Sequence, residues 1–200
     1  IVGGALAVTA LMGLAACGTP ADTSGGNSTA DNGSAASGDT VVIGVFEPLS
    51  GDNGAGGKQE VLGIQYANSV KPTVTIGGEE YKIELDIQDN QSSTDKAVSA
   101  AQQLVADKVS VVLGSYGSGV SIAAGTYFAN AKIPAIGCSC TNPPGTEANP
   151  YYFRVCFLDP FQGTVMANYA IDEGYTTAAV ISQNGDDYST GLAGFFKQAY

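Results

Sequence analysis

The chain of 200 residues contains no histidine and few basic residues. Without histidine, neither a Ser-His nor a Cys-His catalytic pair can form within this stretch. Lys and Arg number 8 against 19 Asp and Glu, which gives a formal net charge of −11. Nucleic acid is therefore not an expected partner, because its binding depends on basic side chains that neutralise phosphates. The acidic balance suits a protein that stays soluble outside the cytoplasm.

The apolar run at residues 1–16 is shorter than the roughly 20 residues that span a membrane. Its length is typical of the core of a signal peptide. The run ends in the sequence LAAC at Cys17, which resembles a bacterial lipobox and predicts cleavage before Cys17 and lipidation of its thiol. A buried helix with a chance cysteine is the alternative. The first residue is Ile1 and the basic start of a signal peptide is lacking, so we expect a fragment.

The segment 17–39 begins with this cysteine and is otherwise rich in Gly, Ser, Thr, Ala, Asn and Asp. It contains no large apolar residue, so it cannot bury enough surface to offset the entropy lost on ordering. We therefore expect a flexible tether. With lipid on Cys17, the tether would hold a folded domain at the extracytoplasmic face of a bacterial cell membrane, on the periplasmic or cell-surface side.

From residue 40 onward, strand-like and helix-like segments alternate, which predicts an α/β fold with a parallel sheet. The run VVIGVF at 41–46 is typical of a strand buried on both faces. The clearest helix is 94–107, with Thr94 as its N-cap and apolar residues on one face. Further strands are predicted at 79–89, 109–113, 133–136, 151–156 and 177–182, and further helices at 58–70, 119–130, 161–172 and 191–200.

Two short polar turns, 114–119 and 137–141, follow neighbouring predicted strands. Ligands of open α/β sheets bind at the carboxyl edge of the strands, so these turns are expected to hold a small polar molecule. The glycine-rich turn 47–57 is not a phosphate loop, because Lys58 is followed by Gln59 and residue 52 is Asp. A loop at the lip of a ligand site, or a plain connection, is favoured there.

Five separated segments carry a resemblance to a known family: VVIGVFEPLSG, DNQSSTDKAVSAAQQLVADKVSVVLGSYGS, IPAIGCSCTNPP, YYFRVCFLDPFQG and AVISQNGDDYSTG. In this order they resemble the branched-chain amino acid (Leu/Ile/Val) binding proteins of ABC transporters, type I periplasmic-binding proteins, over about residues 40–200. The resemblance implies two doubly wound parallel-sheet lobes that close on a ligand. Residues 40–156 would form lobe 1, still incomplete, and 157–200 the hinge crossing and the start of a truncated lobe 2.

The resemblance also implies the function and the first ligand contacts. The protein would capture an amino acid, branched-chain or related, and deliver it to an ABC permease, without catalysis and without a cofactor. Ser118 matches the family position whose hydroxyl binds the ligand carboxylate, and Tyr116 beside it could form a wall of the pocket. The simpler alternative is that Ser118 only caps the helix that it opens.

Other positions match the family's ammonium site. Ser139 and Thr141 fall in the turn whose first position offers a backbone carbonyl and whose second offers a hydroxyl; an ordinary Ser/Thr turn is the alternative. Tyr188 matches the lobe 2 tyrosine that closes over the ligand, unless it is only a loop aromatic. Asp159, in the hinge, could add negative charge near the ammonium group.

One position departs from the family pattern. Relatives often place an aromatic side chain over the ligand's side-chain pocket, and here the matching residue is Gly56. A missing ring predicts a roomier pocket. Larger or polar amino acids, or another small carboxylate, therefore stay open as ligands beside Leu, Ile and Val.

Three cysteines follow Cys17, namely Cys138, Cys140 and Cys156. Three thiols with no histidine make a poor zinc site, so no metal is expected. An exported protein can form disulfides, and we expect Cys156 to pair with Cys138 or Cys140. The remaining thiol would be buried or paired elsewhere.

Two other functions compete with solute delivery. A sensor module of the same fold would signal to a receptor instead of a permease, but a lipid anchor disfavours it. An α/β hydrolase would use Ser118 or a free cysteine as its nucleophile. Ser118 lacks the nucleophile-elbow pattern, because positions 116 and 120 are Tyr and Val where that pattern has Gly.

Overall fold

A computed structural model describes residues 40–147 and 149–200 of the chain. The predicted signal peptide, the lipidation of Cys17 and the tether lie outside the described residues and stay predictions. Among the described residues, no helix combines the length and the apolar character that crossing a membrane requires.

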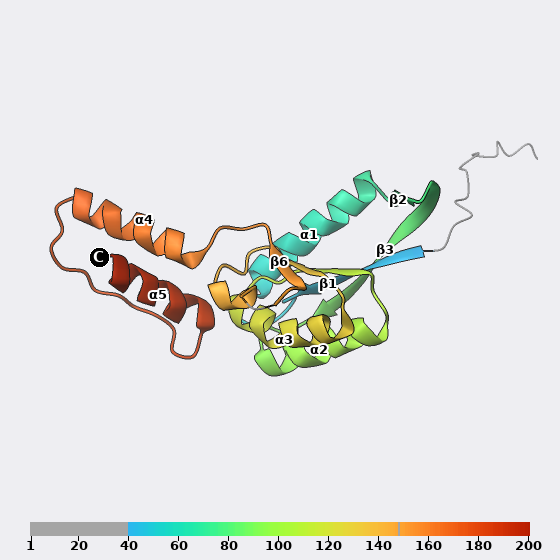
Figure 1. Cartoon of the computed structure of the whole chain (residues 1–200). Helices are drawn as coiled ribbons and strands as arrows, with labels where there is room; N and C mark the ends of the chain where they lie inside the picture. The colour runs from blue at the N-terminus through green and yellow to red at the C-terminus, as the bar shows by residue number, and fades with distance from the viewer. Residues whose placement is uncertain (1–39, 148) are drawn as a thin grey trace, which may run out of the picture. The chain divides into compact units, whose positions relative to one another are not determined.

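The described residues form one six-stranded sheet flanked by helices (Figure 1). The strands lie in the order β2-β3-β1-β4-β5-β6; β2 pairs antiparallel with β3, and the other pairings are parallel. This confirms the predicted α/β class. The strands are β1 (Thr40–Glu47), β2 (Thr73–Ile76), β3 (Glu79–Asp89), β4 (Val111–Leu113), β5 (Ala135–Gly137) and β6 (Tyr152–Arg154). The helices are α1 (Gly54–Val70), α2 (Thr94–Ala106), α3 (Ser118–Ala131), the 3-10 turn η1 (Pro143–Gly145), α4 (Asp159–Asp172) and α5 (Asp187–Ala199).

Strand β1 lies in the interior of the sheet, between β3 and β4. Its first half is exposed or half-buried, and its second half, from Gly44 to Glu47, is buried. The prediction of a strand buried on both faces is thus confirmed for the part nearest the carboxyl edge. Its last residue, Glu47, is fully buried although it is acidic.

The core lies between the sheet and the helices α2 and α3, which cover one face, while α1 lies on the other (Figure 1). The rings of Phe46 in β1 and Phe128 in α3 meet edge to face, with centroids 5.7 Å apart. Leu104 of α2 is fully buried in the same cluster. Burying these side chains supplies the main apolar contribution to stability.

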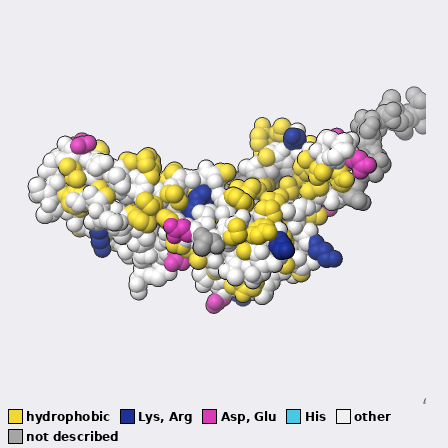
Figure 2. Space-filling view, viewed as in Figure 1, with side chains coloured by type: hydrophobic (Ala, Val, Ile, Leu, Met, Phe, Trp, Pro, Cys, Tyr) yellow, Lys and Arg dark blue, Asp and Glu magenta, His cyan; other side chains and the backbone are white. Residues whose placement is uncertain are grey.

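Helix α1 buries fewer apolar side chains than its sequence pattern predicts. Val61 is buried, but Leu62, Tyr66 and Val70 are exposed. Figure 2 shows apolar side chains over both α1 and α4, and the basic side chains on this face are scattered rather than gathered in a patch.

Two predictions about secondary structure are wrong. Residues 177–182 do not form a strand: they are exposed and unpaired, because no neighbouring strand lies beside them in the described part to complete a ladder. Thr94 is not the cap of α2, since the N-cap is Ser93 and makes no side-chain capping bond. Strand β2 was not predicted; its four residues pair with β3 across the turn at Gly77 and Gly78.

Helices α4 and α5 pack closely against each other. A Cβ at Gly163 of α4 would lie 2.8 Å from the backbone of Phe195 and Phe196 in α5, so only glycine fits at this contact. Helix α5 begins with a true cap, because the Asp186 side chain accepts a hydrogen bond from the Ser189 N–H at 2.8 Å. This cap sets where the first turn of α5 starts.

Replacing Leu104 by Ala tests the core. We expect the Leu104→Ala variant to lose about 2–5 kcal/mol of unfolding free energy, because a buried leucine leaves a cavity when truncated. Urea unfolding followed by circular dichroism measures the loss. Gln102→Ala, an exposed change on the same helix, is the matched control and should change stability by less than about 0.5 kcal/mol. Equal losses in the two variants would contradict the described core.

Candidate ligand-binding site

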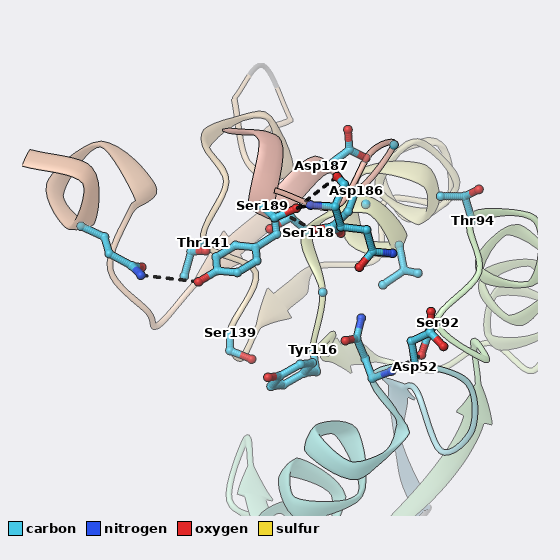
Figure 3. Close-up of a pocket in the computed structure, with 18 of the residues that line it drawn as sticks. Asp52, Ser92, Thr94, Tyr116, Ser118, Ser139, Thr141, Asp186, Asp187 and Ser189 are labelled. Atoms are coloured by element: carbon cyan, nitrogen blue, oxygen red, sulfur yellow. Dashed lines mark hydrogen bonds between the residues drawn. The ribbon is translucent and has the colours of Figure 1, made fainter. Parts of the chain in front are cut away.

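A cavity of about 600 Å³ lies at the carboxyl edge of the sheet (Figure 3). Its walls come from the turns after β1, β3, β4 and β5, from the beginning of α4 with the segment before it, and from the first turn of α5 with the loop before it. Five of the six predicted ligand residues line it, and Asp159 does not. The five are Tyr116, Ser118, Ser139, Thr141 and Tyr188.

The turn 114–119 brings the beginning of α3 to the cavity. Gly114 and Gly117 have φ angles of 121° and 112°, and a Cβ at Gly114 would lie 2.0 Å from the carbonyl oxygen of Phe46. Only glycine permits this backbone path. The first turn of α3 therefore presents unpaired N–H groups and the positive end of its dipole to the cavity, which is a suitable arrangement for an anion.

Ser118 is the first residue of α3 and is almost fully buried. Its hydroxyl accepts a hydrogen bond from the Asn142 N–H at 3.2 Å, which links the turn after β4 to the turn after β5. The N-cap of α3 is Gly117, and no side-chain capping bond is made. The alternative in which Ser118 serves only as a helix cap is therefore not supported, and its hydroxyl keeps its proton available for a ligand.

The turn 137–141 carries two further hydroxyl groups to the cavity, those of Ser139 and Thr141. The Ser139 hydroxyl donates to Glu60 Oε1. Thr141 is nearly buried, and its backbone carbonyl accepts from the Asp159 N–H at 3.1 Å. Within the described residues, neither the Thr141 hydroxyl nor the Asp159 carboxylate makes a hydrogen bond of good geometry.

Asp159 lies behind the cavity wall, at the first position of α4. It is fully buried, and burial raises the pKa of its carboxyl group, while the Thr141 hydroxyl and the Arg154 guanidinium act in the opposite direction. It therefore contacts the ligand turn through Thr141 and does not itself line the cavity. The prediction that it adds negative charge near an ammonium group stays a prediction.

The loop before α5 and its first turn close another side of the cavity. Tyr188 is partly exposed, and its hydroxyl accepts a long hydrogen bond of 3.4 Å from Gln162 Nε2. Asn142 Nδ2 donates to the Asp187 carbonyl at 2.7 Å, which fastens this turn to the one after β5. The sequence reasoning did not identify the carboxylates of Asp52, Asp186 and Asp187, which also line the cavity (Figure 3). These aspartates belong to polar loops that are far apart in the sequence, and no sequence pattern predicts that they meet at one cavity.

The space beside Gly56 is filled rather than open. A Cβ at Gly56 would lie 2.6 Å from the ring of Tyr116, so the ring occupies the place that a side chain at 56 would take. The space directly beside Gly56 is thus occupied, and the prediction of a roomier pocket stays a prediction. An aromatic ring is present, and it comes from the turn after β4 instead of the turn after β1.

Two buried carboxyl groups that sequence reasoning missed lie next to these turns. Glu47 Oε2 accepts from the Tyr116 N–H at 2.7 Å, and its oxygens approach those of Glu60 and the thiol of Cys138 to within 4.8 Å. Burial raises the pKa of Glu47 to about 9, with further contributions from Glu60; the Tyr116 N–H and Cys138 oppose the shift. The only signal in the sequence is an acidic residue that ends an otherwise apolar strand.

The predicted disulfide is absent. Cys138, Cys140 and Cys156 are free thiols, and burial raises the pKa of each. The Cys156 sulfur approaches the carbonyl oxygen of Cys140, at 3.5 Å, while the Cys140 side chain is buried in the core. Neither of the two expected pairings, Cys156 with Cys138 or with Cys140, is therefore formed.

Arg154 makes the connection that a disulfide was expected to make. Its guanidinium donates to the carbonyl oxygens of Cys140, Asn142 and Pro143 at 2.7–3.0 Å. It also donates to the Thr146 hydroxyl, at 2.6 Å from Nη2. Several charge-assisted bonds from one planar group hold the turn after β5 against β6.

The Gly56→Ala variant tests the position of the Tyr116 ring. The added methyl group must displace the ring, so we expect thermal stability to fall although Ala favours a helix. Gly63→Ala is the matched control on α1, because a Cβ there meets nothing within 4 Å, and it should stabilise the protein by about 0.5–1 kcal/mol. Stabilisation of similar size in both variants, measured by calorimetry, would show that the ring does not pack on Gly56.

Removing the Arg154 guanidinium tests the account of the turn. We expect Arg154→Ala to lose about 2 kcal/mol or more of unfolding free energy, because buried carbonyl groups lose a charged donor. A thiol reductant should leave the melting temperature of the wild-type protein unchanged, since the three cysteines in the described part of the chain form no disulfide. A drop in melting temperature with reductant would contradict the free-thiol description.

Stability should also depend on the protonation of Glu47. Its folded pKa, about 9, exceeds the ordinary 4.5, so the folded state holds a proton that the unfolded state releases between these values. We therefore expect the unfolding free energy to fall as pH rises from about 5 to about 9, by at most about 1.4 kcal/mol per pH unit for one proton. Urea titrations at several pH values measure the slope. Glu47→Gln should flatten it, and an unchanged slope in that variant would contradict the assignment.

The chain is similar to known proteins over most of its described residues. The sequence model described as "Periplasmic binding protein" matches residues 40–200. The chain is 34% identical over 155 residues to the Leu/Ile/Val-binding protein homolog 1 of Brucella abortus, covering 76% of this chain and 41% of that protein.

Two crystal structures are similar to the described fold. A leucine-binding protein from Thermotoga maritima shares 33% identity with a TM-score of 0.75, over 80% of this chain and 45% of that one. A branched-chain amino acid transporter substrate-binding protein from Streptococcus pneumoniae, in complex with isoleucine, shares 32% identity with a TM-score of 0.72, over 80% and 47%. The chain thus spans less than half the length of these relatives. The chain belongs to the periplasmic binding protein family.

Proposed function

We propose that this chain is part of the extracytoplasmic solute-binding component of an ABC importer, which captures an amino acid and delivers it to a permease. One observation carries the proposal: the beginning of α3 with Ser118, and the turn with Ser139 and Thr141, line the same cavity, and we assign donors for an anion to the first and acceptors for a cation to the second. Ser118 and the first turn of α3 form the donor wall, and Ser139 and Thr141 form the acceptor wall. A free amino acid is a zwitterion and needs both.

The size and walls of the cavity favour a small ligand. About 600 Å³ is typical of a small-molecule site, and the rings of Tyr116 and Tyr188 offer apolar surface beside the polar groups. A relative in complex with isoleucine and another named as leucine-binding support a branched-chain or related amino acid. No chemical step is required, and the chain has no histidine to activate Ser118.

The proposal extends to the arrangement of the complete protein. Residues 40–156 would belong to one lobe, and residues 157–200 to the hinge crossing and the beginning of a second lobe that closes over the ligand. Ligand-driven closure is a population shift that needs only a difference in affinity between the open and closed states. Cys17 would carry the lipid that keeps the protein at the extracytoplasmic face of the membrane.

Calorimetric titration of the complete protein against the twenty amino acids and a set of small carboxylates tests the function. We expect at least one amino acid to bind, and Ser118→Ala to weaken it about 10- to 100-fold, because one hydrogen bond to a charged group is lost. Ser110→Ala, an exposed change before β4, is the control and should bind normally. If the wild-type protein showed no heat of binding with any compound of the panel, amino-acid binding would be contradicted.

A further inference from the structure

Glu47 and Glu60 lie behind the cavity wall and do not line the cavity. Glu47 ends β1 and is fully buried, while Glu60 belongs to α1 and is half-buried. Each carboxyl group contacts a different ligand turn. The Tyr116 N–H donates to Glu47 at 2.7 Å, and the Ser139 hydroxyl donates to Glu60. The pair therefore connects the two turns from behind.

Each of the two carboxyl groups keeps one oxygen without a partner. Glu47 Oε1 and Glu60 Oε2 are both buried, and neither has a hydrogen-bond donor among the described residues. The two groups approach within 4.8 Å. Two ionised carboxylates this close would repel each other and leave two charges in a site shielded from water. One proton held between the unpartnered oxygens would satisfy both at once.

Among the residues that the structure describes, no basic side chain acts on Glu47 in place of that proton. The side chains that act on Glu47 are Glu60 of α1 and Cys138 of the turn after β5, and Glu47 in turn faces Tyr152 of β6. The thiol and the phenol are neutral near pH 7, because burial raises the pKa of each. The raised pKa of Glu47 is in keeping with a proton held on the pair. The pair as a whole then keeps one negative charge.

The bond from Ser139 to Glu60 determines what Ser139 can do in the cavity. A serine hydroxyl has one proton, and here that proton is directed to Glu60, so only its lone pairs remain for a ligand. Ser139 lines the cavity in this state. It can accept a hydrogen bond from an ammonium group, but it has no proton left to donate to a carboxylate.

We propose that Glu47 and Glu60 share one proton in a buried bridge, and that Glu60 thereby fixes Ser139 as an acceptor that selects ligands with an ammonium group. The inference rests on the proposed binding function and deepens it. Glu60 is a positioning residue, since it acts through Ser139 and does not touch the cavity. Glu47 holds the opposite end of the bridge through the backbone of Tyr116, beside the turn that faces the carboxylate.

Paired ligands separate this role from a purely structural one. Leucine and 4-methylpentanoate differ only in the ammonium group, and both are titrated into the complete protein and its Glu60→Ala variant. We expect Glu60→Ala to lower the affinity for leucine by tenfold or more and the affinity for 4-methylpentanoate by less than twofold. Glu60→Gln retains an acceptor oxygen for Ser139 and should recover most of the lost leucine affinity. Glu79→Ala, an exposed carboxylate in β3, is the control and should leave both affinities unchanged.

Equal weakening of both ligands by Glu60→Ala would overturn the selective role and leave Glu60 as a structural residue. Failure of the wild-type protein to bind leucine or any other amino acid would instead overturn the proposed function.

The shared proton has its own test, which needs no ligand. Infrared difference spectra at neutral pH should show the carbonyl band of a protonated carboxyl group, lost in Glu47→Gln, and its absence from the wild type would overturn the bridge.

A cation in place of the proton is the remaining outcome, since two carboxylates and a thiol can also bind a divalent metal. Elemental analysis of the purified complete protein distinguishes the two. We expect the metal content of the protein to be the same with and without the Glu60 carboxyl group. One equivalent of zinc in the wild-type protein that is lost in Glu60→Ala would overturn the shared proton.

Discussion

The parallel pairing of β4 with β5 is the constraint on which the site depends. Val112 lies opposite Ala135 and Leu113 opposite Ile136, so both strands end at the same edge of the sheet. The turns that follow them, one with the beginning of α3 and one with Ser139 and Thr141, must then emerge side by side. Antiparallel pairing would send the two turns to opposite edges. That both turns line one cavity is thus a consequence of strand direction.

Short strands of three residues each would not hold two turns in place without further contacts. The contacts come from polar groups in the layer behind the cavity. Arg154 binds several carbonyl groups of the turn after β5, Asn142 joins that turn to α3 and α5, and the carboxyl pair joins it to the turn after β4. Buried polar groups of this kind destabilise a protein unless they are hydrogen-bonded. Here their hydrogen bonds hold the backbone of the two turns in place.

The fold was predictable because its signals are local. Apolar runs such as VVIGVF and the regular pattern of 94–107 identify strands and helices within a few residues, and the alternation of the two determines the parallel sheet. The candidate residues followed from the resemblance to the family, and five of six line the cavity. The strand predicted at 177–182 failed because a strand is defined by its neighbours, and none lies beside this segment in the described part.

What sequence could not predict depends on side-chain direction and on long-range pairing. The expected export of the protein suggested a disulfide, but the Cys140 side chain is buried in the core and the Cys156 thiol meets a carbonyl group. Gly56 suggested an empty space, but a ring from a residue 60 positions later fills it. Glu47 and Glu60 meet only because β1 and α1 pack together, and neither residue belongs to a motif that would have revealed the contact.

The central claim is that one cavity binds an amino acid with its carboxylate at the beginning of α3 and its ammonium group at the turn after β5. A crystal structure of the complete protein with its bound amino acid tests this most directly. We predict ligand carboxylate oxygens within hydrogen-bond distance of the Ser118 hydroxyl and the first N–H groups of α3, and the ammonium nitrogen within that distance of Ser139 or Thr141. A ligand bound in the reverse orientation, or elsewhere in the protein, would contradict the account.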